Sequence, residues 1–159
     1  MTSYSATGNA FYTSTGNIKI SDSEVVAKSF SGNYPALVAA YDVIISNGIV
    51  NVSTDGQDYG IWANRDVQIK GAADVTSSGL KGVIGSGNSF TVIPSDGKLV
   101  DIWMGDSENN VSRYGDSPIS EETVITEDSL YFHSKAHTHT FDMQIIFDSY
   151  KASDATCIE

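Results

Sequence analysis

The sequence predicts an all-β protein, a short right-handed parallel β-helix of about four coils with capping strands at its C-terminal end. Three observations lead to this prediction. Similar stretches recur every 23 to 25 residues, each stretch contains apolar residues spaced two apart, and turn-forming residues separate the stretches. A repeat of this length with three short strands per unit is what one coil of a parallel β-helix requires.

One strand of each unit begins with a polar residue and continues with an apolar pair. The polar residues are Asn17, Asp42, Asp66 and Ser89, and the pairs are Ile18 with Ile20, Val43 with Ile45, Val67 with Ile69, and Phe90 with Val92. Residues two apart on a strand point to the same face of the sheet. We therefore expect these pairs to stack as one inward column, with about 4.8 Å between successive coils.

Two further strands complete each unit. A second apolar pair follows the first, formed by Val25 with Ala27, Val50 with Val52, Ala73 with Val75 and, after an insertion around Pro94, Val100 with Ile102. A third segment precedes each opening, at residues 9–15, 34–41, 59–65 and 81–87. The sequences between them, such as SNG, TDG and SSG, are typical of turns.

A β-sandwich is the alternative fold, because short strands with regular turns also fit it. We favour the β-helix because the same columns recur from unit to unit, which a sandwich does not require. The repeat fades after Gly105, so we expect coils at 8–105, a loop and capping strands at 106–147, and a tail toward a following module at 148–159. A cap is needed because an open coil end exposes unpaired backbone groups. Trp103 is expected in the core of the last coil.

The charge and composition argue against some classes of binding partner. A formal net charge of −11 is expected to repel nucleic acid and anionic lipid surfaces. No apolar run approaches the roughly 18 residues that a membrane-spanning helix needs.

The first residues do not resemble a signal peptide, so the chain is expected either to be cytosolic or to begin after a removed signal. Cys157 is the one cysteine, so it forms no disulfide within the chain.

Trp62 lies in the third unit between Ile61 and Ala63, which form an inward pair. Its side chain is therefore predicted to point outward. Its column is expected to contain Val38 and Ile84. Such an apolar stripe is either a ligand-binding surface or is covered by the C-terminal strands or by another copy of the chain.

An outward aromatic ring on a rigid strand can stack on the apolar face of a sugar. Tyr59 and Tyr41 lie at nearby turns. The candidate carbohydrate-binding residues are therefore Trp62, Tyr59 and Tyr41.

The stretch "GIWANRDVQIKG", from Gly60 to Gly71, resembles a motif of β-helical, pectate-lyase-like surface repeat modules of anaerobic gut and cellulolytic Firmicutes. Residues 137–159 also resemble a tail that joins such helices to a following cysteine-bearing repeat. The resemblance implies a secreted or cell-surface bacterial protein, and some members look like calcium-dependent polysaccharide-binding domains. It also implies neighbouring modules in the same chain, with a partner for Cys157 in one of them.

Asp42 and Asp66 are the candidate metal ligands, with calcium as the expected cofactor. They occupy the same position in successive coils, and Asn17 precedes them in the column. Calcium takes six to eight oxygen ligands, some of which stacked carboxylates supply. The alternative is that these side chains cap turns through hydrogen bonds to the backbone.

The three histidines, His133, His137 and His139, are close in sequence. His137 and His139 are two apart, so on a strand they share a face and could hold a metal ion. Structural zinc, however, usually takes four ligands. A polar linker is the alternative reading of this stretch.

Catalysis has little support in the sequence. A lyase needs a basic group that abstracts a proton, yet only Arg65 and Arg113 are arginines. A glycosidase needs two carboxylates at a defined separation, and Glu121 with Glu122 is expected to be solvated. We therefore predict a non-catalytic module that binds a polysaccharide or cell-wall glycan or acts as a structural spacer. The alternatives are a polysaccharide lyase or hydrolase, and a protein-binding adhesion repeat.

Overall fold

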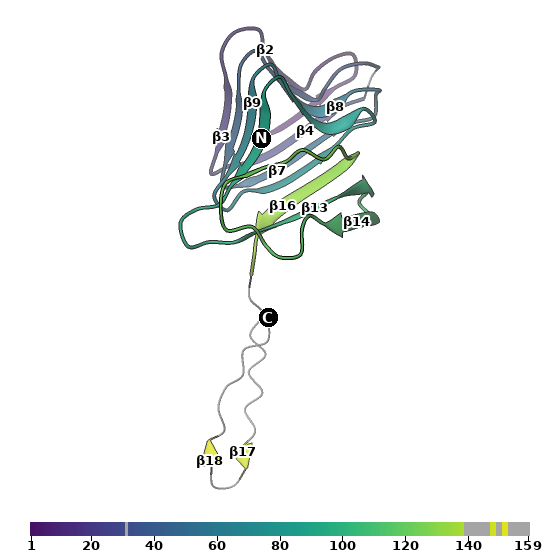
Figure 1. The fold of residues 1–159 in the computed structure, drawn as a ribbon. Coiled ribbons are helices and arrows are strands. Elements are labelled where there is room, and N and C mark those ends of the chain that lie inside the picture. The colour runs from purple at the N-terminus through teal and green to yellow at the C-terminus, as the bar shows by residue number, and fades with distance from the viewer. Residues whose placement is uncertain (31, 139–146, 149–150, 153–159) are drawn as a thin grey trace.

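The computed structural model describes residues 1–30, 32–138, 147–148 and 151–152. Every regular element within these residues is a β-strand, and the chain winds into a β-solenoid of about four turns with parallel stacked sheets (Figure 1). The predicted parallel β-helix is thereby confirmed, and the sandwich alternative is wrong. None of the described residues belongs to a helix that could cross a membrane.

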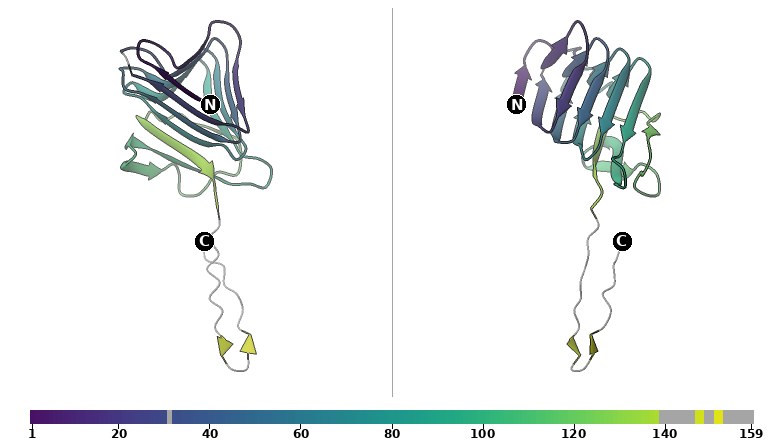
Figure 2. Two further views of the ribbon diagram at one scale, coloured as in Figure 1. Left: turned by 180° about the vertical axis from the view of Figure 1, so that it is seen from behind. Right: turned by 90° about the vertical axis from the view of Figure 1, so that its left-hand side faces the viewer.

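Three strands make up each turn, and each strand joins one of three sheets. The first sheet contains β1 (Thr2–Ser5), β4 (Glu24–Ser29), β7 (Ile49–Thr54) and β10 (Asp74–Ser78) in parallel. The second contains β2 (Phe11–Thr13), β5 (Leu37–Ala39), β8 (Tyr59–Ala63) and β11 (Gly82–Ser86). The third contains β3 (Ile18–Ser21), β6 (Val43–Ser46), β9 (Asp66–Lys70) and β12 (Ser89–Ile93). Figure 2 shows the successive turns side by side, with the N-terminus at one end.

The first inward column is the one that the sequence predicts. Val43 pairs with Ile18 on one side and with Val67 on the other, and Phe90 follows Val67. Val43 and Val67 are fully buried, whereas Ile18 is half-buried because its turn lies at the end of the solenoid.

The second column differs from the prediction in the third turn. Val75 lies beside Val50, and Ser77 lies beside Val52, so the pair in this turn is Val75 with Ser77 rather than Ala73 with Val75. A shift of two residues leaves the same side chains facing inward, so hydrophobicity alone does not distinguish the two registers. The buried Ser77 hydroxyl donates a hydrogen bond of 2.7 Å to the backbone carbonyl of Val83.

Val100 and Ile102 are buried, but they do not extend this column as predicted. Their strand, β13 (Val100–Ser107), is separated from β10 by β16 (Tyr131–Ala136), which is antiparallel to both. β14 (Asn110–Arg113) then pairs with the far edge of β13. Figure 1 shows β16, β13 and β14 continuing the sheet beyond β7. A later strand thus takes the position that the repeat assigned to β13.

The C-terminal end of the solenoid is capped, as predicted. β15 (Thr123–Val124) pairs antiparallel with β12, and β16 pairs antiparallel with β10. Between them, the Val83 amide donates to the Ser129 carbonyl at 2.9 Å. These bonds satisfy backbone groups that the last turn would otherwise leave unpaired.

Trp103 does not lie in the core, contrary to the prediction. It is half-buried, stacks on His133 with ring centroids 5.3 Å apart, and has the Lys135 ammonium 5.4 Å from its ring centroid.

Beyond the cap, β17 (Phe147–Asp148) and β18 (Lys151–Ala152) form an antiparallel pair. His139 and Cys157 lie outside the described residues, as does most of the tail on which the resemblance partly rests.

Candidate functional site

Trp62 occupies an outward column of the second sheet, as predicted. It pairs with Val38 in the preceding turn and with Gly85 in the following turn, and its side chain is half-buried. The predicted neighbour Ile84 is wrong, because Ile84 pairs with Ile61 and packs against the core. The repeat between these two turns is 23 residues long, one more than the alignment of Trp62 with Ile84 assumes.

The rings of Tyr59 and Trp62 lie on a glycine surface. A Cβ atom at Gly85 would be 2.3 Å from Cε3 of Trp62, and one at Gly82 would be 2.7 Å from Cε1 of Tyr59. Because a side chain at either position would clash with the rings as they lie, the two rings pack directly on the backbone of β11. Glycines 23 residues after each aromatic residue are a sequence signal of this arrangement that our sequence analysis missed.

Both rings are held by neighbouring groups. Their centroids are 5.2 Å apart, with an interplanar angle of 36°. The indole nitrogen of Trp62 donates a 2.9 Å hydrogen bond to Asn64 Oδ1, and the Lys81 ammonium lies 4.9 Å from the centroid of the Tyr59 ring. A cation at this distance is attracted to the ring face. The pair therefore forms an ordered aromatic platform.

A groove of about 410 Å³ opens beside this platform. It is lined by Tyr59, Trp62 and β11, by residues 88–90, and by the capping segment 124–129. Trp62 and this C-terminal segment therefore border the same groove. The polar and charged residues of this lining are Ser86, Asn88, Ser89, Thr126, Glu127, Asp128 and Ser129.

Tyr41 is not among the residues that line this groove. It is exposed, and the guanidinium carbon of Arg65 lies 4.8 Å from the centroid of its ring. The structure thus brings together two of the three candidate carbohydrate-binding residues, Tyr59 and Trp62, and places Tyr41 beside the polar column that precedes the third sheet.

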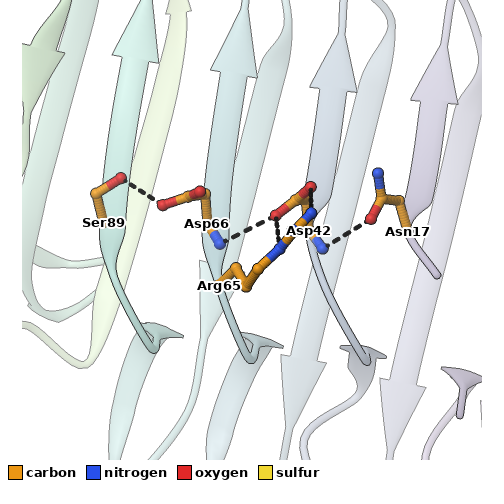
Figure 3. Close-up of polar contacts among 5 residues, drawn as sticks. All are labelled: Asn17, Asp42, Arg65, Asp66 and Ser89. Atoms are coloured by element: carbon orange, nitrogen blue, oxygen red, sulfur yellow. Dashed lines mark hydrogen bonds and ion pairs between the residues drawn. The ribbon is translucent and has the colours of Figure 1, made fainter. Parts of the chain in front are cut away.

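That polar column forms a ladder of hydrogen bonds from turn to turn (Figure 3). The Asp42 amide donates to Asn17 Oδ1 at 3.1 Å, and the Asp66 amide donates to Asp42 Oδ1 at 3.4 Å. The Ser89 hydroxyl donates to Asp66 Oδ1 at 2.8 Å. Backbone capping, the alternative to metal binding, is therefore observed at Asn17 and Asp42.

Arg65 binds the Asp42 carboxylate with two nitrogens, Nε at 3.1 Å and Nη2 at 2.6 Å (Figure 3). This bidentate hydrogen bonding is the main cause that lowers the pKa of Asp42. A calcium ion at Asp42 and Asp66 would have to compete with the Arg65 guanidinium. In the part of the chain that the structure describes, no group of three or more His, Cys, Asp or Glu side chains is arranged to hold a metal ion.

The two histidines within the described residues contact separate carboxylates. His133 Nε2 lies 2.9 Å from Asp74 Oδ1, and His137 Nδ1 lies 2.6 Å from Asp101 Oδ2. Arg113 also forms an ion pair with Asp101. The two histidine contacts link β16 and the residue after it to β10 and β13.

Comparisons with protein-family models, with curated proteins and with solved structures gave no match for this chain. The β-solenoid fold is the part of the resemblance that the structure bears out. Membership of the bacterial surface modules stays a hypothesis.

Proposed function

We propose that this chain is a non-catalytic polysaccharide-binding module. The observation that supports the proposal is the Tyr59–Trp62 platform, which borders a groove rich in hydroxyl, amide and carboxylate groups. Aromatic rings offer a large apolar surface to the C–H face of a sugar, and the polar side chains match its hydroxyls.

The platform is preorganised, which favours binding. Trp62 is held by Asn64 and by the flat surface at Gly85, so little side-chain freedom remains to be lost when a ligand binds. The stacked turns of the solenoid give the strand beneath it a rigid support.

A non-catalytic role is consistent with the two arginines. Arg65 pairs with Asp42 and Arg113 with Asp101, and the hydrogen bond to Asp42 raises the pKa of Arg65 further. An arginine whose pKa is raised is a poorer proton acceptor, whereas a lyase needs a base. We further propose that the module acts outside a bacterial cell or on its surface, beside other modules of the same chain, where polysaccharides and cell-wall glycans are found.

The test compares binding of the wild-type chain and Trp62→Ala to immobilised polysaccharides. Loss of one stacking platform is expected to lower affinity roughly five- to a hundredfold, by analogy with base stacking on aromatic side chains. Because Trp62 is only half-buried, the same variant should lose no more than about 1–2 kcal/mol of stability.

Trp103→Ala is the matched control, because Trp103 is also half-buried but lies in the first sheet, outside the groove. Equal binding losses in Trp62→Ala and Trp103→Ala, or no polysaccharide binding by the wild-type chain, would contradict the proposal. Release of shortened or unsaturated sugars would favour the lyase or hydrolase alternative.

A further inference from the structure

We infer that the bound polysaccharide is a linear, uncharged chain that runs along the solenoid axis, across the strands, and that it stacks on Tyr12 as a second platform. This inference rests on the proposed function and assigns the orientation and chemical class of the ligand.

Tyr12 belongs to the same outward column as Trp62. Tyr12 pairs with Val38, and Val38 pairs with Trp62, so the three side chains follow one another along the solenoid axis. Tyr12 is 64% exposed. Two turns separate the aromatic residues, which corresponds to about 10 Å along the axis. This separation is comparable with the length of a disaccharide unit.

The surface beside Val38 and Trp62 is hollowed, although Tyr12 itself does not line the hollow. A second groove, of about 310 Å³, is lined by Val38 and Trp62 together with Tyr34 and Pro35. Trp62 lines this groove and also the one beside the cap, so the two meet at its ring. A chain laid along the strands would cross one of these aromatic residues, whereas a chain laid along the axis crosses both.

The charges along this path disfavour an acidic polymer. Three carboxylate residues line the two grooves, Asp58, Glu127 and Asp128, against a single ammonium group, that of Lys81. That ammonium already lies over the Tyr59 ring. With a net charge of −11 for the whole chain, a polyuronate would be repelled, while a neutral glycan would meet hydrogen-bond acceptors for its hydroxyls.

The experiment measures affinity by calorimetry for neutral β-1,4-linked glucan and xylan oligosaccharides of increasing length, and for oligogalacturonate of matched length. Tyr12→Ala is expected to lower affinity for the longer neutral oligosaccharides five- to a hundredfold and to leave that for disaccharides unchanged. Trp62→Ala should lower both. Tyr4→Ala is the control, because Tyr4 is 63% exposed but lies on β1, in a different sheet.

Three results would overturn the inference. Tyr12→Ala could bind long oligosaccharides as well as the wild-type chain does, or Tyr12→Ala and Tyr4→Ala could lose affinity equally. Oligogalacturonate could bind as tightly as the neutral chains. Each of these leaves the proposed function standing if Trp62→Ala still weakens binding, whereas a wild-type chain that binds no glycan removes both.

Discussion

Gly85→Ala tests whether the Trp62 ring depends on the glycine beneath it. The added methyl group would lie 2.3 Å from Cε3 and 2.5 Å from Cζ3 of Trp62, and 3.0 Å from Cδ2 of Tyr59. Carbon atoms in favourable contact are about 3.5–4.0 Å apart. The indole must therefore move by at least about 1.2 Å, away from the backbone of β11.

The effect on stability should be small. Gly85 does not have a positive φ, so alanine adopts its backbone conformation without strain. Replacing glycine then gains about 0.4–1 kcal/mol through the unfolded state. The displaced ring loses part of its packing, so we expect a net change within about 1 kcal/mol. Glycan affinity, in contrast, should fall about five- to a hundredfold, as for loss of one stacking platform.

Two measurements check this expectation. In a Trp103→Phe background Trp62 is the only tryptophan, so a shift of the fluorescence maximum to longer wavelength reports the movement of its ring. Glycan binding is measured on the same proteins. Gly8→Ala is the control, because its methyl group would lie at an ordinary 3.8 Å from Ser5 Oγ. Unchanged fluorescence in Gly85→Ala would refute the close packing of the ring on β11.

Three further predictions concern stability. Ser134 is buried, and its hydroxyl has no hydrogen-bond partner among the described residues. Ser134→Ala should therefore stabilise the protein by about 1 kcal/mol, as measured by urea unfolding. Ser77→Ala breaks a buried hydrogen bond and should destabilise the protein by about 1–3 kcal/mol. Equal losses would show that Ser134 has a partner. Because Arg65 lowers the pKa of Asp42 in the folded state, this carboxylate stabilises the fold above its unfolded pKa of about 3.9 and loses that effect as the pH falls through its folded pKa. Asp42→Asn should therefore be less stable than the wild-type chain at neutral pH, and should lose less stability than the wild-type chain on acidification below about pH 4. Parallel curves of unfolding free energy against pH for the two proteins would contradict this. If Asp42 and Asp66 bind calcium, a chelator should lower the melting temperature of the wild-type chain but not that of Asp66→Asn.

The sequence was sufficient for the inward columns because they depend on local spacing. Val43 and Ile45 lie two apart and return one coil later as Val67 and Ile69, and this pattern alone fixes both the face and the stacking. The outward direction of Trp62 followed from the same rule.

The predictions that were wrong concern register and strand order, which the two-residue spacing of apolar side chains does not determine. The register of Val75 could shift by two residues without exposing an apolar side chain, and only pairing with Val50 decides it. The Trp62 column was misplaced by one residue because Gly85 has no hydrophobic side chain to mark it. The position of β16 depends on pairing between strands 59 residues or so apart, as in the contact of His133 with Asp74, and no repeat encodes such pairing.

The groove itself could not be predicted, because it arises from the way in which the cap meets the last turn. The capping segment bonds to the solenoid where the Ile125 amide donates to the Phe90 carbonyl, and again where the Ser129 carbonyl accepts from Val83. Residues 126–128 lie between these two attachments, are exposed and line the groove. The cap thus satisfies backbone groups at both attachments, while the residues between them line the groove that the aromatic platform borders. Substitutions at 126–128 are therefore expected to change ligand preference with little effect on folding, because the bonds that close the solenoid lie on either side of them.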